Sequence, residues 1–167
     1  MVKSLYLGVD IGTYESKGVL VDIKGNIIAQ SSKKHQLLVP QQGWAEHRPI
    51  EDWWNDFVFI CNDLIRKSKC NSSDIKAVTS SAIGPCMLPV DKNGNPLMNA
   101  VLYGVDTRAS KEIIELNNLI GEKKIIEFGG NPLTSQSVGP KILWLKKNRK
   151  DIYDKTYKIL NSTSFIN

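Results

Sequence analysis

The chain has 167 residues, of which 41% are hydrophobic and 23% are charged, and its formal net charge is +5. This length supports one sizeable hydrophobic core, and the composition is that of an ordinary globular protein. No apolar run approaches the ~20 residues that cross a bilayer, and no leader pattern precedes the first apolar run, so no membrane association and a cytoplasmic location are expected. The lysines are scattered or sit at predicted helix ends, which argues against a nucleic-acid partner. Three cysteines without CxxC spacing predict reduced thiols and no zinc site.

The first part of the chain predicts an antiparallel meander of three strands. Apolar runs over about 5–10, 16–22 and 26–33 have strand character. The tripeptide Lys24-Gly25-Asn26 between the second and third runs is typical of a tight hairpin turn. A loop containing Pro40, Gly43 and Trp44 follows the meander.

Pro49 begins the clearest helix, which should extend to about residue 69. Acidic residues in its first turn and basic residues in its last turn suit the helix dipole. Its apolar residues recur at helical spacing and should form one stripe packed on a sheet: Ile50, Trp53, Trp54, Phe57, Ile60, Cys61, Leu64 and Ile65. We therefore expect Trp53 and Trp54 to lie in the core and not in a stack around a ligand.

A strand over 74–81 should return after this helix, which completes a right-handed β-α-β unit. Short strands over 87–90 and 100–103, a helix over 107–120 that ends at Gly121, a helix from Gly139 and a strand over 157–160 complete the expected elements. The helix over 107–120 should bury Ala109, Ile113, Leu116 and Ile120.

The element order predicts the fold class. The order βββαβα describes an α/β fold with a mixed sheet and flanking helices, the ribonuclease H-like half of the actin-type ATPase architecture. A Rossmann unit would have a helix directly after its first strand, and the chain has neither GxGxxG nor GxxxxGK[ST].

The turn between the first two strands carries the clearest chemistry. In the sequence Asp10-Ile-Gly-Thr13, Gly12 lets the backbone come close to a phosphate group because it has no Cβ. The neighbouring amides and the Thr13 hydroxyl can donate to phosphate oxygens, Lys17 can neutralise charge, and Asp10 can hold Mg²⁺ directly or through water. The alternative is a plain hairpin that contains an Asp and a Gly by chance.

Several motifs in order along the chain resemble the N-terminal part of the FGGY family of carbohydrate kinases, nearer its xylulokinase-like members. The resemblance covers nearly all of the chain. It rests on Asp10–Thr13 with Lys17, Gly43–Glu46, Pro49–Trp54, Gly84-Pro85, Ala100–Arg108, Gly129–Pro132 and Gly139–Trp144.

This resemblance implies ATP-dependent phosphorylation of a hydroxyl group on a sugar, sugar acid or polyol. By position, it implies a magnesium-associated role for Asp10 and phosphate contacts for Gly12, Thr13 and Lys17. It also implies binding of a small-molecule sugar by a set of five residues: Ile83, Gly84, Pro85, Asp106 and Arg108.

Two of these assignments carry an alternative. Gly84 and Pro85 stand where xylulokinases have a Met-His pair, and Ile83 stands where they have the preceding Gln. The polar sugar contacts of xylulokinases are therefore replaced there, and the resemblance does not assign D-xylulose as the substrate. Asp106 and Arg108 could instead form a salt bridge that caps the following helix.

The resemblance further implies that residues 1–167 are an incomplete N-terminal kinase domain. Family members are about three times as long, their catalytic base is an aspartate beyond residue 167, and the full-length protein could be a homodimer. No catalytic residue is therefore assigned here, and the chain is expected to be inactive alone, because phosphoryl transfer depends on positioning both substrates.

Two other functions remain open at this point. The first is a non-kinase nucleotide-binding protein of the actin/Hsp70 type, which has no reason to carry the motifs over 43–54 and 100–108. The second is a ribonuclease H-like nuclease, for which Asp10, Asp22 and Asp106 lack a convincing fourth carboxylate.

Overall fold

A computed structural model describes residues 4–167, which form two compact units. The first unit comprises the described residues up to Leu37 together with Arg48–Ile83 and Ser162–Asn167, and the second comprises Leu38–His47 and Gly84–Asn161. Within the described residues, no helix combines the length and the apolarity needed to span a membrane.

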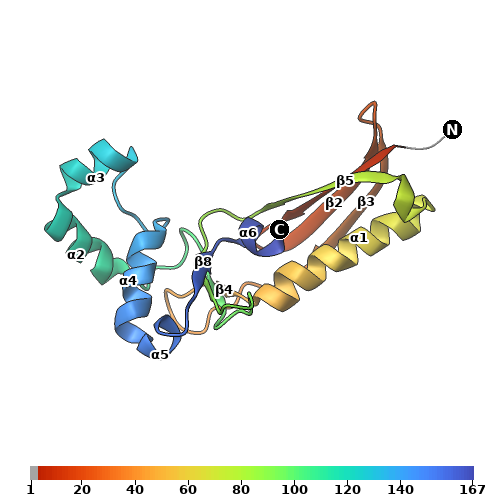
Figure 1. Cartoon of the computed structure of the whole chain (residues 1–167). Helices are drawn as coiled ribbons and strands as arrows, with labels where there is room; N and C mark the ends of the chain where they lie inside the picture. The colour runs from red at the N-terminus through yellow and green to blue at the C-terminus, as the bar shows by residue number, and fades with distance from the viewer. Residues whose placement is uncertain (1–3) are drawn as a thin grey trace. The chain divides into compact units, whose positions relative to one another are not determined.

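The first unit is built on a four-stranded sheet in the order β3-β2-β1-β5 (Figure 1). Strands β1 (Leu5–Ile11), β2 (Glu15–Asp22) and β3 (Ile27–Lys34) are antiparallel neighbours, and β5 (Ile75–Ala82) runs parallel to β1. The predicted meander and the strand returning after the helix are therefore confirmed.

Helix α1 (Asn55–Ser68) covers one face of this sheet, after a π-helical turn over Pro49–Trp54. Strand β1 alternates buried and more exposed residues, as expected of a strand with one covered face. A Cβ at Gly18 of β2 would lie 2.3 Å from Ile60 Cγ2, so the absence of a side chain there lets α1 approach the sheet.

The apolar stripe predicted for this helix is only partly buried. Trp53, Ile60 and Leu64 are fully buried, whereas Ile50 and Trp54 are each 43% exposed, so the core position predicted for Trp54 is wrong. The physical reason is that part of the helix–sheet interface is polar. In it, Ser16 Oγ of β2 donates to Asp56 at 2.9 Å, and Ser31 Oγ of β3 donates to Asp63 at 2.7 Å.

Three short segments complete this unit. Lys69 adopts a left-handed conformation (φ 52°) and ends α1, and a 3₁₀ turn over Ser72–Asp74 leads into β5. Helix α6 (Ser162–Ile166), which the sequence analysis did not predict, brings the Phe165 ring to 6.0 Å from that of Trp53. This contact ties the end of the chain to the core of the first unit.

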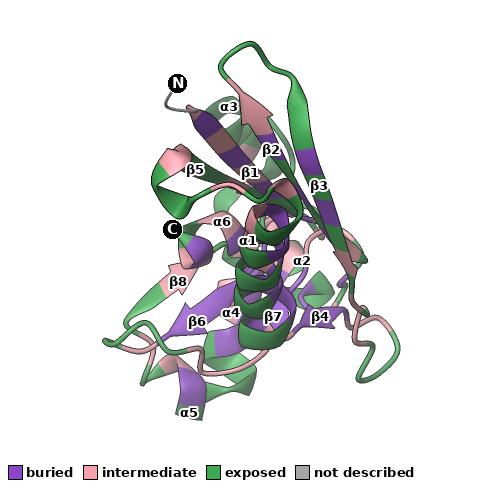
Figure 2. Cartoon of the chain, turned by 90° about the vertical axis from the view of Figure 1, so that its right-hand side faces the viewer, coloured by how far each residue is buried: buried purple, intermediate pink, exposed green. Residues whose placement is uncertain are grey.

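The second unit has two small antiparallel sheets and four helices. Strands β4 (Glu46–His47) and β7 (Ala100–Val101) pair, as do β6 (Leu88–Val90) and β8 (Lys158–Leu160). Figure 2 shows β4 and β6 as buried. The helices are α2 (Ser110–Ile120), α3 (Glu122–Gly129), α4 (Val138–Asn148) and α5 (Lys150–Tyr153). The expected strands are present but shorter.

Helices α2 and α3 differ from the sequence analysis. Helix α2 ends at Gly121, which has φ +90°, as predicted, but Ile120 is 44% exposed and not inward-facing. Helix α3 was not predicted and has no buried residue. The core of this unit lies elsewhere, around Met87, Val101, Ala109, Trp144, Leu145 and Ile152.

Candidate functional site

The turn between β1 and β2 is tight at Gly12. The Gly12 N–H donates to the Glu15 carbonyl at 3.1 Å, and a Cβ at position 12 would lie only 2.7 Å from that same oxygen. Because backbone atoms cannot yield as a flexible side chain does, the turn requires glycine at this position. The half-buried Thr13 follows directly, at the tip of the turn.

Asp10 and Lys17 lie opposite each other on β1 and β2. Directly opposed residues on antiparallel strands have Cβ atoms about 5 Å apart and share one face of the sheet. Here that is the face away from α1, because the neighbouring Gly18 faces the helix. Asp10 and Lys17 therefore flank the same surface beside the turn.

Among residues 4–167, the Lys17 ammonium has one ion-pair partner, and the pair is weak. Its Nζ lies 3.3 Å from the Glu15 carboxylate, and the Lys17 side chain is 66% exposed. Exposed ion pairs of this kind contribute little free energy, so Lys17 can exchange Glu15 for a phosphate group at small cost. Hydrogen bonds from Ser32 and Lys17 lower the pKa of Glu15.

The residues present fit a magnesium ion that is bound mainly by phosphate and water. Among residues 4–167, no hydrogen bond or ion pair engages the exposed Asp10 carboxylate, and no group of three or more His, Cys, Asp or Glu residues could hold a metal. Magnesium typically takes one or two protein carboxylates and completes its shell with waters and substrate phosphates. A single carboxylate at Asp10 suits that arrangement.

A pocket of about 300 Å³ lies on this face of the sheet. Asp10, Lys17 and neighbouring residues of β1 and β2 line one side, and three residues of β5 line the other: Thr79, Ser80 and Ser81. Ser81 is the register partner of Asp10 in the parallel pair. The sequence analysis missed these three residues, although the predicted parallel return strand could have indicated them.

The residues expected on the sugar side lie in two places. Ile83 follows β5, where its N–H donates to the Ile11 carbonyl at 2.8 Å and its carbonyl accepts from Ser162 Oγ at 2.5 Å. Gly84 and Pro85 are exposed, and the Cys86 N–H donates to the Gly84 carbonyl at 2.7 Å, which forms a tight turn. These three residues offer apolar atoms and backbone groups but no polar side chain.

Asp106 and Arg108 form the salt bridge that the sequence analysis gave as an alternative, but no described side chain caps helix α2, whose N-cap residue is Ala109. Arg108 Nε and Nη2 lie 2.9 Å and 2.8 Å from the two Asp106 oxygens, and Nη2 also lies 2.8 Å from Glu46 Oε1. The Arg108 and Asp106 side chains are both fully buried. The Arg108 guanidinium stacks 3.9 Å from the Trp44 ring and lies 5.0 Å from the Trp144 ring. Sugar contact by either residue stays a prediction.

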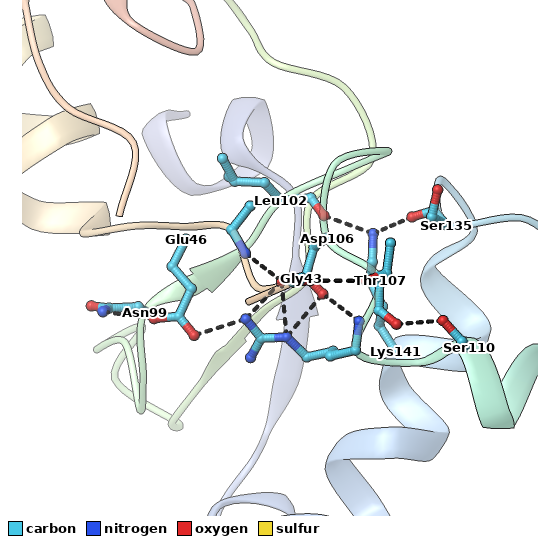
Figure 3. Close-up of polar contacts among 11 residues, drawn as sticks. Gly43, Glu46, Asn99, Leu102, Asp106, Thr107, Ser110, Ser135 and Lys141 are labelled. Atoms are coloured by element: carbon cyan, nitrogen blue, oxygen red, sulfur yellow. Dashed lines mark hydrogen bonds and ion pairs between the residues drawn. The ribbon is translucent and has the colours of Figure 1, made fainter. Parts of the chain in front are cut away.

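The same cluster anchors two loops of the second unit (Figure 3). The Ala45 N–H donates to Asp106 at 2.7 Å, and Asn99 donates to Glu46 at 3.0 Å. The buried Lys141 ammonium donates to the carbonyls of Leu102 and Ser135 at 2.8 Å and 2.7 Å. Burial lowers the pKa of Lys141.

This cluster brings together in space residues from three motifs that lie far apart in the sequence. Trp44 and Glu46 come from one motif, Asp106 and Arg108 from a second, and Trp144 from a third. The two indole rings meet edge to face, with centroids 5.3 Å apart. The three motifs therefore form one ionic and aromatic assembly, in which Trp44 packs against Trp144 and Arg108.

Comparison with curated proteins finds relatives in two groups of carbohydrate kinase. The xylulose kinase of Lactococcus lactis subsp. lactis is 30% identical over 154 residues, which are 92% of this chain and 30% of that protein. Glycerol kinase 2 of Streptomyces coelicolor is 33% identical over 141 residues, which are 84% of this chain and 27% of that protein. The chain thus spans about 30% of the length of the curated relatives it matches.

Solved structures agree on the fold. The gluconate kinase from Lactobacillus acidophilus matches with a TM-score of 0.88 at 25% identity, over 98% of this chain and 32% of that chain. The xylulose kinase from Rhodospirillum rubrum matches with a TM-score of 0.89 at 23% identity, over 97% and 33% respectively. The expected actin-type ATPase architecture is therefore confirmed. The family model described as "FGGY family of carbohydrate kinases, N-terminal domain" matches residues 5–167, and this chain belongs to that family.

Proposed function

We propose that this chain binds the phosphate tail of ATP for a kinase that phosphorylates a hydroxyl group of a sugar, sugar acid or polyol. The observation that carries the proposal is the turn at Gly12, which has no room for a side chain and is flanked by an exposed carboxylate and an exposed ammonium on one sheet face. The similarity to a xylulose kinase and a glycerol kinase supports the reaction class.

Each residue of the turn has a role in this proposal. Gly12 keeps the turn tight, with its N–H bound to the Glu15 carbonyl, and the Thr13 amide and hydroxyl donate hydrogen bonds to phosphate oxygens. Lys17 leaves Glu15 to offset the negative charge that develops on the transferred group. Asp10 orients the magnesium ion, directly or through water. ATP supplies the phosphoryl group, and magnesium supplies additional charge neutralisation. Ser81 lies beside Asp10 and can hold a water of the metal shell.

On the sugar side, Ile83, Gly84 and Pro85 contact the substrate in this proposal, because the latter two are exposed where β5 ends. Asp106 and Arg108 act on the substrate side by holding the loop at Ala45, since their charges neutralise each other in a buried cluster. With apolar atoms at 83–85, sugar hydroxyl groups would be recognised there through backbone groups. The free thiols of the three cysteines suit a reducing compartment, and we place the protein in the cytoplasm.

The test is ATP-dependent phosphorylation by the full-length protein across ketopentoses, hexuloses, polyols and aldonates. We expect turnover of at least one class, and about a hundredfold loss of kcat in Lys17→Met, the usual size of losing one charge-stabilising contact. Lys24→Met is the matched control, because Lys24 lies in the exposed hairpin turn after β2. Absence of phosphorylation with every substrate, together with ATP binding, would favour the non-kinase nucleotide-binding alternative.

A further inference from the structure

His35 follows β3 and reaches the candidate phosphate-binding turn. Its side chain is only 4% exposed. Its Nδ1 atom lies 2.8 Å from Asp56 Oδ2 of α1, and its Nε2 atom lies 3.0 Å from the carbonyl oxygen of Gly12. The imidazole ring therefore links the helix on one side to the turn on the other.

Both partners of the ring are hydrogen-bond acceptors. A backbone carbonyl can only accept, and an ionised carboxylate can only accept. Asp56 is ionised in this setting because Ser16 donates to it at 2.9 Å and Lys33 Nζ lies 2.8 Å from its other oxygen. Burial raises the pKa of Asp56, but hydrogen bonds from His35, Lys33 and Ser16 outweigh this and lower it overall. Both ring nitrogens of His35 must then carry protons, so the ring is an imidazolium.

The backbone of His35 binds the same turn. Its N–H donates to the Tyr14 carbonyl at 3.0 Å, so one residue contacts two carbonyls of the turn. The Gly12 carbonyl and the Thr13 N–H belong to one peptide group, and no peptide bond among the described residues is cis. In a trans peptide these two groups point in opposite directions. Holding the carbonyl toward His35 therefore directs the Thr13 N–H away from it.

We propose that His35 is a positioning residue for the turn: as an imidazolium held by Asp56, it binds the Gly12 carbonyl and fixes the orientation of the Gly12–Thr13 peptide group. The Thr13 amide is one of the donors that the proposed function assigns to phosphate, so the consequence for ligand binding rests on that function. The clamp itself depends only on the hydrogen bonds of His35.

The clamp should respond to pH in a defined direction. The charged groups around His35 are Lys33 and Lys34 of β3, Arg48, Glu51 and Asp52 of the segment before α1, and Asp56 of α1. Burial lowers the pKa of His35, but the hydrogen bond and charge of Asp56 and the bond to Gly12 outweigh this, so the pKa lies above 6.5. A raised pKa means that the clamp is complete below pH 6.5 and is lost as the pH rises through the folded-state pKa.

Nuclear magnetic resonance of the chain between about pH 6 and pH 9 tests the clamp directly. At pH 6.5 we expect more than half of His35 to be doubly protonated, and the Thr13 amide nitrogen to shift with the midpoint of His35. His47, the other of the two histidines, serves as a reference because it lies in the second unit. A His35 ring that is mainly neutral at pH 6.5 would overturn the proposal. So would a Thr13 amide shift that does not change with the His35 titration.

Two variants separate positioning from simple stability. Asp56→Asn should move the His35 and Thr13 midpoints together to lower pH, because it removes the charge that raises the His35 pKa. His35→Gln keeps a neutral donor of similar reach, so the Thr13 signal should lose its pH dependence while the fold is kept. A Thr13 transition that persists unchanged in His35→Gln would show that another group controls the turn.

Binding of magnesium tripolyphosphate tests the functional consequence without an adenosine group. As the pH rises through the His35 transition, the affinity of the wild type for this ligand should fall, and this fall should be about tenfold larger than in His35→Gln. A tenfold difference is the effect of losing one charge-assisted hydrogen bond. Equal losses in both proteins would overturn the role of His35 in binding. If tripolyphosphate fails to bind at every pH while Thr13 still follows His35, the proposed phosphate site is refuted and the clamp is supported.

Discussion

Replacing Arg108 by methionine should be among the most damaging single changes in the second unit. The substitution leaves two carboxylates without their shared cation. The Asp106 side chain is fully buried, and the Glu46 side chain is only 7% exposed. Breaking a buried ion pair by removing one partner costs about 3–5 kcal/mol, because the remaining charge is left unpaired. The stacking of the guanidinium on Trp44 is lost as well, although methionine replaces part of that apolar contact.

This loss is large relative to the whole stability of a domain, which is about 5–15 kcal/mol. Urea unfolding followed by circular dichroism and tryptophan fluorescence measures it, and Trp44 and Trp144 report on the cluster because both rings flank Arg108. Arg149→Met is the matched control. The ion pair of Arg149 with Asp151 is 3.2 Å long and largely exposed, so its loss should change the free energy of unfolding by less than about 0.5 kcal/mol.

The double variant Arg108→Met with Asp106→Asn isolates the cause. If the cost comes from an unpaired buried charge, removing the Asp106 charge should recover part of the stability that the single variant loses. A single variant that loses less than about 1 kcal/mol would refute the reasoning. So would a double variant that is less stable than Arg108→Met alone.

Three further changes follow from the first unit. Gly12→Ala places a Cβ 2.7 Å from the Glu15 carbonyl, so we expect MgATP affinity, measured by titration calorimetry, to fall about tenfold or more. Gly18→Ala places a Cβ 2.3 Å from Ile60 Cγ2 and should cost about 1–3 kcal/mol in urea unfolding. Asp56 has a pKa below its ordinary 3.8 when folded, so its stabilisation is present above pH 3.8 and is lost as the pH falls through the folded-state value. Asp56→Asn should therefore flatten the acid dependence of stability.

Each of these three predictions has a measurable outcome that would contradict it. Gly129→Ala is the control for the glycine changes, because a Cβ built there meets no described atom within 4 Å beyond its chain neighbours and its own helix backbone. Equal stability of Gly18→Ala and Gly129→Ala would disprove the packing argument, and unchanged MgATP affinity in Gly12→Ala would show that the turn accepts a side chain. An acid unfolding profile of Asp56→Asn that matches the wild type would remove Asp56 as a source of pH dependence.

The fold could be predicted from local patterns where those patterns are strong. Alternating apolar residues and the Lys24-Gly25-Asn26 turn indicated the meander, and the order of strands and helix indicated the actin-type architecture. Helix α3 escaped prediction because it has only eight residues, fewer than the roughly 11–18 residues over which helical periodicity is read. Trp54 was misplaced because the spacing of its stripe does not reveal that Asp56 and Asp63 also face the sheet.

Some residues of the candidate site could likewise be predicted from local sequence patterns, and others could not. Asp10, Gly12 and Lys17 could be found from the sequence because they share one turn and its flanking strands. Ser81 could be found only after β5 was aligned in register beside β1. His35 could not be found at all, since 23 positions separate it from Gly12 and only the ladder between β2 and β3 brings them together.

The central claim is that the turn from Asp10 to Lys17 holds the phosphate tail of ATP. Mapping MgATP binding onto the amide signals of the chain tests this most directly. The account predicts that shifts concentrate at residues 10–17 and 79–81, and that Gly12→Ala needs at least about tenfold more MgATP to reach the same shifts. Shifts concentrated instead in the basic segment over 146–150 would contradict it. So would the absence of shifts at millimolar MgATP, a concentration at which even a binding free energy of about −4 kcal/mol would produce them.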